Sequence, residues 1–380
     1  MPSVSLISCQ TYNQPEVDQA IQSLGLIDKI VKPGQKVLLK VNMLMGAAPE
    51  QAITTHPAIV AAVIKEVKKA GGIPLVGDSS GNPLSDYMQT MAQCGFVQVC
   101  QKYGAGVLSF QQDGIVDVPS PSNNKKIKTI KLAKAVLDVD VIINLPKLKT
   151  HGWTLYTGAI KNLFGLVPGF YKSRYHLYAP QPFEFAKTLV DILEITKPQL
   201  HILDAVYGME GAGPTAGKPR AMGVIVASTD AVALDAVCST LIGYKPMDID
   251  TTKIAHDRGL GTGLLEKIHI EGPDLSSFVI KDWQHSASTY NLTKNIPHFI
   301  NLILQPLLAR WLRVDPVVNQ AKCTKCQVCV KSCPVKTIHN KNKKVIIDHS
   351  KCIMCYCCHE LCKYEAIDLK RSWLARKMGI

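Results

Sequence analysis

The sequence predicts an α/β protein in which helices cover both faces of a mostly parallel sheet, followed by a small cysteine-rich α+β domain. Over the first 285 residues, continuous apolar runs alternate with amphipathic helical patterns, as in buried parallel sheets whose strands are joined by helices. A length of 380 residues suffices for one large core and one further module. Nine of the 13 cysteines lie after residue 320, which sets the last part of the chain apart.

The strands and helices of the large domain are expected in a regular order. The predicted strands are Val4–Ser8, Lys36–Val41, Ile73–Val76, Val139–Leu145, Leu200–Leu203 and Val224–Ala227. The predicted helices are Val17–Leu24, Ala58–Lys69, Tyr87–Tyr103 and Ala231–Leu241. In open sheets of this kind the ligand crevice lies at the carboxyl ends of the strands. Polar residues that follow a strand are therefore candidate site residues.

These candidates comprise two carboxylates and four basic side chains. They are Asp78, Asp204, Lys147, Lys149, His151 and Lys161. The basic side chains fall within 15 residues and predict a cationic patch for a carboxylate or phosphate, with His151 or Lys161 able to supply a proton. The alternative is that the lysines face solvent and that the aspartates cap turns or helices.

Two glycine-rich segments fall short of nucleotide-binding motifs. The first segment is at residues 211–218. A P-loop there would need glycine at Ala212, and Pro219 stands where the motif has the Ser or Thr that binds Mg²⁺. The second, at residues 259–263, follows a helical pattern where a dinucleotide fingerprint would follow a strand. No nucleotide or flavin site is predicted.

Composition narrows the class of protein. A hydrophobic content of 47% and a mean hydropathy of +0.08 exclude a disordered or fibrous chain. No window reaches the ~18 uninterrupted apolar residues that span a bilayer, and the N-terminal stretch lacks the basic start of a signal peptide. We therefore expect a cytoplasmic protein with no transmembrane segment.

Two cysteine runs carry the chemistry. Residues 323–334 and 352–363 each contain C-x2-C-x2-C-x3-C, the spacing that binds two [4Fe-4S] clusters, with the fourth thiol of each run completing the other cluster. The first cluster is assigned to Cys323, Cys326, Cys329 and Cys362, and the second to Cys352, Cys355, Cys358 and Cys333. An odd cysteine count without a signal peptide argues against a disulfide framework. Two zinc ions on eight thiols remain the alternative.

This segment, from about Val317 to Leu369, resembles the two-[4Fe-4S] bacterial ferredoxin module. The resemblance implies a small α+β ferredoxin-like domain built by internal duplication, with a hairpin between the runs. Lys363 stands where the family usually has proline, so its turn is less rigidly set. Cys357 is not needed by the pattern, and is interpreted as a buried spare thiol, with a ligand exchange or redox role as the alternative.

The positive charge is concentrated in the same region. Residues 321–380 carry 13 Lys+Arg and 4 Asp+Glu, whereas the first 320 residues carry 30 and 26. Aromatic residues make up only 6% of the chain and no basic helix of nucleic-acid type occurs, so nucleic-acid binding is not expected. Lysines would offset the negative charge of thiolate-bound clusters and attract an acidic redox partner.

Several phrases of the large domain resemble an uncharacterised family, "domain of unknown function" 362, often fused to such a ferredoxin module. They are residues 40–44 (KVNML), 55–57 (THP), 77–81 (GDSSG), 144–169 (NLPKLKTHGWTLYTGAIKNLFGLVPG) and 203–214 (LDAVYGMEGAGP). The resemblance implies a cytoplasmic prokaryotic iron–sulfur protein, commonly from anaerobes, with no assigned reaction. His151, the small-residue turn and Lys161 are also similar to the N-terminal half of lactate-racemase-type proteins, although this stretch does not imply a nickel cofactor.

The chain is thus expected to divide into four parts: the α/β domain at 1–285, a linker or helical segment at 286–316, the two-cluster domain at 317–370 and a tail at 371–380. The first hypothesis is that two [4Fe-4S] clusters relay electrons between a soluble partner protein and a small anionic substrate in the α/β domain, as in a ferredoxin-dependent oxidoreductase. The alternatives are a non-catalytic electron-transfer partner that docks a separate enzyme, and a cluster carrier or assembly factor.

Overall fold

The computed structural model describes residues 1–112, 114–122, 126–288, 290, 311 and 313–377. Its centre is a ten-stranded sheet with the order β12-β1-β11-β10-β7-β2-β3-β4, to which β8 and β9 are added beside β10. The strands are β1 (Ser3–Ser8), β2 (Lys36–Lys40), β3 (Ile73–Asp78), β4 (Gly106–Ser109), β7 (Val141–Asn144), β8 (Lys147–His151), β9 (Leu155–Thr157), β10 (Leu200–Glu210), β11 (Lys218–Ser228) and β12 (His269–Glu271). A separate hairpin pairs β5 (Ile115–Pro119) with β6 (Thr129–Ala133).

Most strand pairs of the sheet are parallel, which confirms the predicted fold class. The parallel pairs are β1–β12, β7–β10, β8–β10, β2–β7, β2–β3 and β3–β4. Strand β11 runs antiparallel to β1 and β10, and β9 runs antiparallel to β8. The carboxyl ends of β2, β3 and β7 therefore meet at one edge of the sheet.

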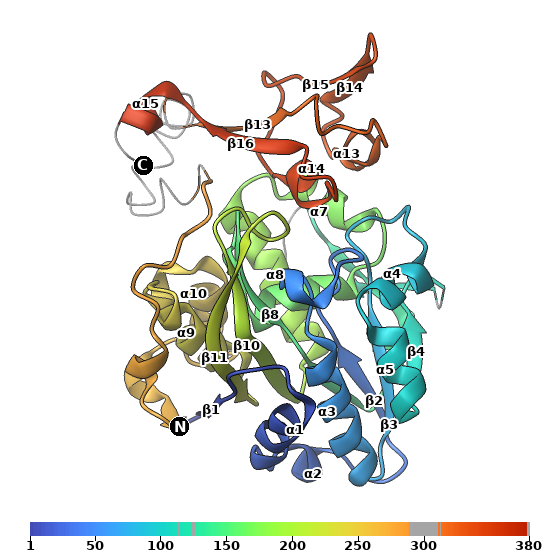
Figure 1. Cartoon of the computed structure of the whole chain (residues 1–380), viewed down its shortest axis with the longest axis vertical. Helices are drawn as coiled ribbons and strands as arrows, with labels where there is room; N and C mark the ends of the chain where they lie inside the picture. The colour runs from blue at the N-terminus through green and yellow to red at the C-terminus, as the bar shows by residue number, and fades with distance from the viewer. Residues whose placement is uncertain (113, 123–125, 289, 291–310, 312, 378–380) are drawn as a thin grey trace.

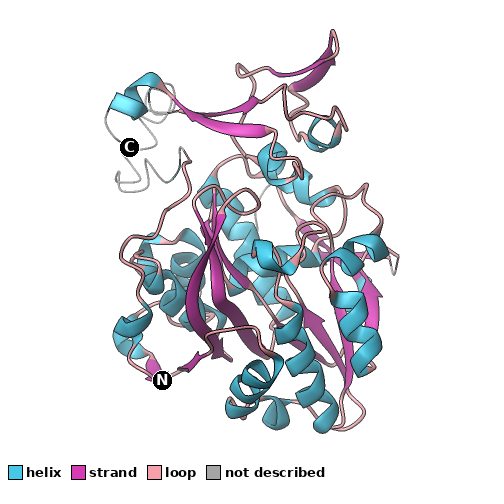
Figure 2. Cartoon of the chain, in the orientation of Figure 1, coloured by secondary structure: helices cyan, strands magenta, loops and turns pink. Residues whose placement is uncertain are grey.

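Helices cover both faces of the sheet (Figures 1 and 2). One face packs against α1 (Gln14–Ser23), α3 (Pro57–Lys69) and α5 (Phe96–Tyr103), and the other against α6 (Ala159–Asn162), α8 (Pro182–Thr196), α9 (Ala231–Leu241) and α10 (Asp250–Asp257). Strand β2 shows why both layers are needed: Leu38 joins one apolar core, while Val37 and Leu39 join the other. Side chains that alternate across a strand require apolar cover on both sides.

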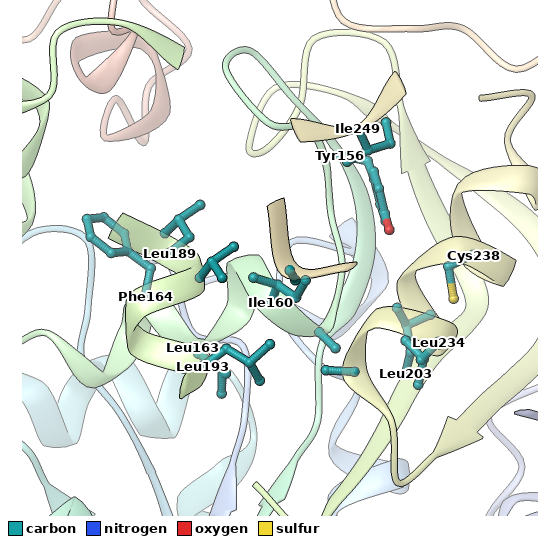
Figure 3. Packing of buried hydrophobic residues seen from close by; sticks show 14 of the residues in the cluster. Tyr156, Ile160, Leu163, Phe164, Leu189, Leu193, Leu203, Leu234, Cys238 and Ile249 are labelled. Carbon is teal, nitrogen blue, oxygen red and sulfur yellow. The ribbon is translucent and has the colours of Figure 1, made fainter. Parts of the chain in front are cut away.

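The second face holds the core that supports the site. Figure 3 shows Ile160 and Leu163 packed among Leu189 and Leu193 of α8 and Leu234 of α9. These residues are buried, and α6 makes contacts with both α8 and α9. The short helix α6, which carries Lys161, is thus held by apolar packing on its inner side.

The structure differs from the sequence-based expectation in several places. The predicted helix at 87–103 is two helices, α4 (Tyr87–Gln93) and α5, because Gly95 adopts a φ of +79° between them. Residues 147–151 form strand β8, where only polar residues after a strand were expected, and β10 continues to Glu210 beyond the predicted 200–203. Helices α7 (Tyr171–Tyr178), α8 and α10, strands β4, β9 and β12 and the β5–β6 hairpin were not predicted.

The C-terminal module consists of two antiparallel strand pairs and two short helices. Strand β13 (Val314–Val318) pairs with β16 (Ile367–Arg371), and β14 (Ile338–Lys341) pairs with β15 (Lys344–Ile347). The helices are α13 (Val328–Ser332) and α14 (Cys357–Glu360). The chain continues into α15 (Trp373–Lys377).

Backbone geometry reveals the internal duplication of the module. Two residues within the first run and one just after it have left-handed φ values, and so do the three equivalent residues in and after the second run. The equivalent pairs are Lys325 and Met354, Gln327 and Tyr356, and Lys336 and Glu365, with φ between 48° and 63°. Lys363 lies within a turn of the same form as that after Cys333, so proline is not required for it.

The module lies over the edge of the sheet at which β2, β3 and β7 end (Figure 1). Trp153 donates a hydrogen bond from Nε1 to the carbonyl oxygen of Met354, at 2.8 Å. A Cβ atom on Gly152 would approach the Tyr356 ring to 2.8 Å, so the absence of a side chain permits this close contact. Most of the apolar segment at 299–312, within the predicted linker, lies outside the described residues. Within the described part, no helix has the length and apolar character needed to cross a membrane.

Candidate functional site

The predicted ligand cysteines of both runs lie within the module, and several of them are near thiols of the other run. Burial raises the pKa of Cys329 to about 11, with further contributions from Cys362, Cys326 and Cys323. Burial also raises the pKa of Cys352, to which Cys355 and Cys333 add. The fourth cysteine of each run therefore lies close to thiols of the other run.

The loops also provide amide donors to sulfur. The backbone N–H groups of Thr337 and Ala366, each four residues after the last cysteine of its run, donate to Sγ of Cys333 at 3.4 Å and of Cys362 at 3.2 Å. Hydrogen bonds of this kind stabilise thiolate ligands and tune iron–sulfur groups. Among the residues that the structure describes, no three His, Cys, Asp or Glu side chains converge as ligands of a single ion.

A cavity of about 90 Å³ lies between the α/β domain and the module. Its polar lining from the α/β domain includes Asn42, Asp78, Lys149, His151, Lys161, Asn162, Lys172 and His176, and its apolar lining includes Phe164 and Phe170. The module contributes Ser332, Cys357, Glu360 and Leu361. A volume of this size accommodates about six waters or a small anion.

Three lysines give the cavity its positive character. Burial lowers the pKa of Lys149 and of Lys172 to about 7, and it also lowers that of Lys161. Lys149 donates to the carbonyl oxygen of Ile53 at 2.6 Å, and Lys172 to that of Ser79 at 2.5 Å. The Lys161 ammonium lies 5.4 Å from the centroid of the Phe164 ring, and no hydrogen bond from it to another described residue is seen.

Asp78 lies in the cavity wall, where it is paired with a lysine that the sequence analysis did not single out. Lys40, in the last position of β2, approaches Asp78 Oδ1 to 2.9 Å, and both side chains are buried. The backbone N–H of Met43 donates to the other carboxylate oxygen at 2.7 Å. A Cβ atom on Gly165 would lie 2.1 Å from Asp78 Oδ1, so glycine leaves space for the ion pair.

His151 is neutral and its tautomer follows from its contacts. Burial lowers its pKa well below the usual value. Nδ1 accepts hydrogen bonds from the backbone N–H groups of Trp153 and Thr154, at 3.1 and 3.2 Å. The proton is therefore assigned to Nε2, which lies 3.2 Å from Oε1 of Glu360 in the module.

Lys147 and Asp204 lie apart from the cavity lining. Lys147 Nζ is 3.0 Å from Asp204 Oδ2 and 2.6 Å from the hydroxyl oxygen of Tyr12, and Tyr12 donates to Asp204 Oδ1 at 2.7 Å. The backbone N–H of His56 completes the network. The side chains of Lys147 and Asp204 are 1% and 0% exposed. Their hydrogen bonds connect elements at the sheet edge, while Asp78, Lys149, His151 and Lys161 share the cavity.

Amide side chains form the floor of the cavity. Asn42 donates to Asn162, which donates to Asn144, each at 2.8 Å. Asp235 of α9 accepts from the backbone N–H groups of Ala159 and Ile160 at the start of α6. This contact fixes the orientation of the helix that carries Lys161 and Asn162.

Some cavity-lining polar atoms have no hydrogen-bond partner in the described part of the chain. They are Asn42 Oδ1, His176 Nδ1, Ser332 Oγ and Glu360 Oε1. Buried polar groups are nearly always satisfied, so these atoms point to a ligand or ordered water. Sequence reasoning missed Lys172 and His176 on α7 (Tyr171–Tyr178), Lys40 on β2 and Glu360 on α14. Neither a motif nor a predicted strand end marks these residues.

Comparisons with known proteins agree with this division of the chain. Residues 37–240 match the family described as "Domain of unknown function (DUF362)", and residues 315–363 match a 4Fe-4S dicluster domain. The dicluster match gives the C-terminal part an iron–sulfur electron-transfer role. Thylakoid-associated protein sll1697 from Synechocystis sp. is 36% identical over 264 residues, which cover 68% of this chain and 80% of that protein.

Two solved structures have a partly similar fold. Lactate racemase apoprotein from Thermoanaerobacterium thermosaccharolyticum gives a TM-score of 0.41 at 11% identity, over 63% of this chain and 56% of that one. A structural-genomics protein from Thermotoga maritima gives 0.37 at 10% identity, over 66% and 60%. The chain thus spans less than two thirds of either protein.

Proposed function

The chain belongs to the family described as "Domain of unknown function (DUF362)", and we propose that it exchanges single electrons between its 4Fe-4S dicluster domain and a small anion in the interdomain cavity. One observation carries this proposal. The cavity is lined jointly by three lysines of the α/β domain and by Cys357 and Glu360 of the module. A molecule bound there would contact the α/β domain on one side and the second cysteine run on the other.

The residues of the module fit two [4Fe-4S] clusters. The first set of ligands is Cys323, Cys326, Cys329 and Cys362, and the second is Cys352, Cys355, Cys358 and Cys333. The neighbouring thiols of Cys329 and Cys352 support this crossed assignment, and the amide donors to the last sulfur of each run suit a thiolate ligand. When bound, such clusters supply or accept one electron at a time.

The side chains of the cavity have separate roles in this proposal. Lys149, Lys161 and Lys172 hold the anion by charge-assisted hydrogen bonds, and Phe164 and Phe170 limit the access of water. Lys161 is the proposed proton donor or acceptor, because its lowered pKa brings its proton transfer nearer to neutral pH. His151 offers a neutral Nε2–H donor beside Glu360.

Two other functions are less well supported by the same observations. A partner that only docks another enzyme does not require an interdomain cavity lined by lysines. A cluster carrier needs releasable metal ligands, yet Cys355 and Cys358 of the second run are each 8% exposed. Packing of this run against the α/β domain, through Trp153 and Tyr356, favours resident clusters.

Replacing Lys161 by Met is expected to weaken anion binding about 10- to 100-fold. The change removes a charge-assisted hydrogen bond worth about 1.5–3 kcal/mol while keeping a side chain of similar length. Binding of inorganic phosphate and of acetate to anaerobically purified holoprotein would be measured by calorimetry. Electron exchange would be followed as reoxidation of the reduced protein, by its visible absorbance, after addition of the small-molecule fraction of a cell extract.

The matched control is Lys253→Met, at a lysine on α10 that is 49% exposed and paired with Asp257. This variant should bind both anions as the wild type does. If Lys161→Met also behaves as the wild type in binding and in reoxidation, Lys161 has no role in the site. If neither anion binds to the wild type, the anionic ligand class is wrong.

Anion affinity is expected to fall as the pH rises above about 7. Lys149 and Lys172 each have a pKa lowered to about 7, so both are largely protonated below that pH and neutral above it. An anion favours the charged lysines, and its binding above pH 7 therefore takes up protons. The dissociation constant of acetate should rise by up to about tenfold per pH unit for each proton taken up. Titrations between pH 6 and 9 in buffers of different ionisation enthalpy would check both the trend and the proton uptake.

A further inference from the structure

The first cysteine run and the hairpin that follows it form a surface with one sign of charge. Residues 321–347 contain seven lysines and no Asp or Glu. We call these side chains the lysine face: Lys322, Lys325, Lys331, Lys336, Lys341, Lys343 and Lys344. All seven are exposed, and none forms an ion pair with a described residue.

The lysine face surrounds the point at which a predicted metal ligand reaches the surface. Cys326 is the one exposed cysteine among the eight proposed ligands, all of which lie in the described part of the chain. Lys325 precedes it directly, and Lys331 follows on α13. The second run differs, because Cys355 and Cys358 are buried and the nearby Cys357 lines the cavity. The most exposed predicted ligand thus lies in the first run and the two buried ones in the second, although Ser332 of the first run also lines the cavity.

From this asymmetry we propose that the lysine face is the docking surface for an acidic one-electron carrier protein. Clustered charge of one sign steers a partner of opposite charge and raises its association rate about 10- to 10³-fold. Docking here places the carrier against the exposed Cys326 and leaves the interdomain cavity free for its own ligand. Partner and substrate would therefore use different ends of the module.

The composition of the surface favours a protein over a membrane or a nucleic acid. Ile346, at 48% exposure, is the one large apolar side chain between residues 321 and 347 that is highly exposed. A membrane-surface element requires an apolar face in addition to its basic one. The segment also contains no Phe, Trp or Tyr, whereas single-stranded nucleic acid is bound by aromatic stacking together with charge.

The test measures binding rather than turnover. The probe is an acidic plant-type [2Fe-2S] ferredoxin, immobilised and exposed to anaerobic holoprotein at increasing ionic strength. We expect the association rate constant to fall at least about tenfold as salt shortens the Debye length from about 30 Å at 0.01 M to about 8 Å at 0.15 M. The double variant Lys325→Glu/Lys331→Glu should reduce the rate constant by a similar factor at low salt. Its iron content and visible absorbance report whether the module has folded.

The matched control is Lys29→Glu/Lys32→Glu, at two exposed lysines in and just after α2 (Ile27–Ile30), which lies at the end of the molecule remote from the module (Figure 1). This variant carries the same change in net charge and should bind the ferredoxin nearly as the wild type does. Should the double variant fail to incorporate iron, Lys325→Gln and Lys331→Gln are measured singly instead. Equal losses in the two charge-reversed variants, or an association rate that does not depend on salt, would overturn the proposal. So would tighter binding, at 0.15 M salt, to anionic vesicles or to DNA than to the ferredoxin.

Discussion

A protein with both Cys355 and Cys362 replaced by alanine is expected to contain almost no iron, although these residues belong to the same cysteine run. In the crossed arrangement Cys355 binds the second cluster and Cys362 the first, so the pair of changes removes a ligand from each. The double variant Cys333→Ala/Cys355→Ala changes both runs but only one cluster. It should keep about four of the about eight iron atoms expected from two cubanes. Iron and sulfide analysis after anaerobic purification would measure the difference.

The control for these variants is Cys357→Ala, which removes a thiol that the spacing does not require. Cys357 is 6% exposed and its pKa is raised well above the usual value, first by a hydrogen bond with Cys355 and then by burial. Its loss should leave the iron content near eight atoms. If instead the four cysteines of each run bound one cluster, Cys355→Ala/Cys362→Ala would lose one cluster and Cys333→Ala/Cys355→Ala would lose both. That pattern would falsify the crossed assignment, and loss of iron from Cys357→Ala would make this thiol a ligand.

Replacing Asp204 by Ala is expected to destabilise the protein by about 3–5 kcal/mol, because a buried charge loses its partner. Asp204 accepts from Lys147 and Tyr12 through its side chain and from the backbone of His56. Without it, the Lys147 ammonium is left without a counter-charge, and burial already lowers the Lys147 pKa. Urea denaturation under anaerobic conditions would measure the change in the free energy of unfolding.

The exposed pair of Asp117 and Lys131 provides the comparison for this variant. Their side chains are 2.6 Å apart, with Asp117 53% exposed, and Asp117→Ala should cost about 0–1 kcal/mol. A similar cost at both positions would mean that Asp204 is not a structural anchor. If Asp204→Ala keeps its stability but no longer binds the anion, Asp204 belongs to the anion-binding site, as the sequence analysis predicted.

The regular elements could be predicted because their signal is local. Apolar runs at β2, β3 and β7 and the amphipathic helix α3 carry their burial pattern within a few residues. Strand β8 lacks such a signal, since its sequence is KLKTH. Its two lysines can be buried because their ammonium groups donate hydrogen bonds, Lys147 to Asp204 and Lys149 to the carbonyl oxygen of Ile53. Those partners are 57 and 96 residues away in the sequence, and no window of residues contains them.

The candidate site likewise has one part that the sequence predicts, the cysteine runs, and one part that it does not, the cavity. The cysteine spacing encodes a loop that closes on itself, so its ligands can be named from a single segment. The cavity has no such segment: Lys172 comes from an unpredicted helix, α7 (Tyr171–Tyr178), and Glu360 from the other domain. Asp78, Lys149, His151 and Lys161 could be selected because they follow strands. The same rule selects Lys147 and Asp204, which the structure places inside β8 and β10, and only tertiary structure separates the two groups.

The contact of Gly152 with Tyr356 and the hydrogen bond from Trp153 to Met354 constrain the order of biogenesis. Once these groups have met, Cys355 and Cys358 of the second run are largely covered, each with 8% of its surface exposed. Any group that these two thiols bind must therefore reach them before the module docks onto the α/β domain, or the module must detach again.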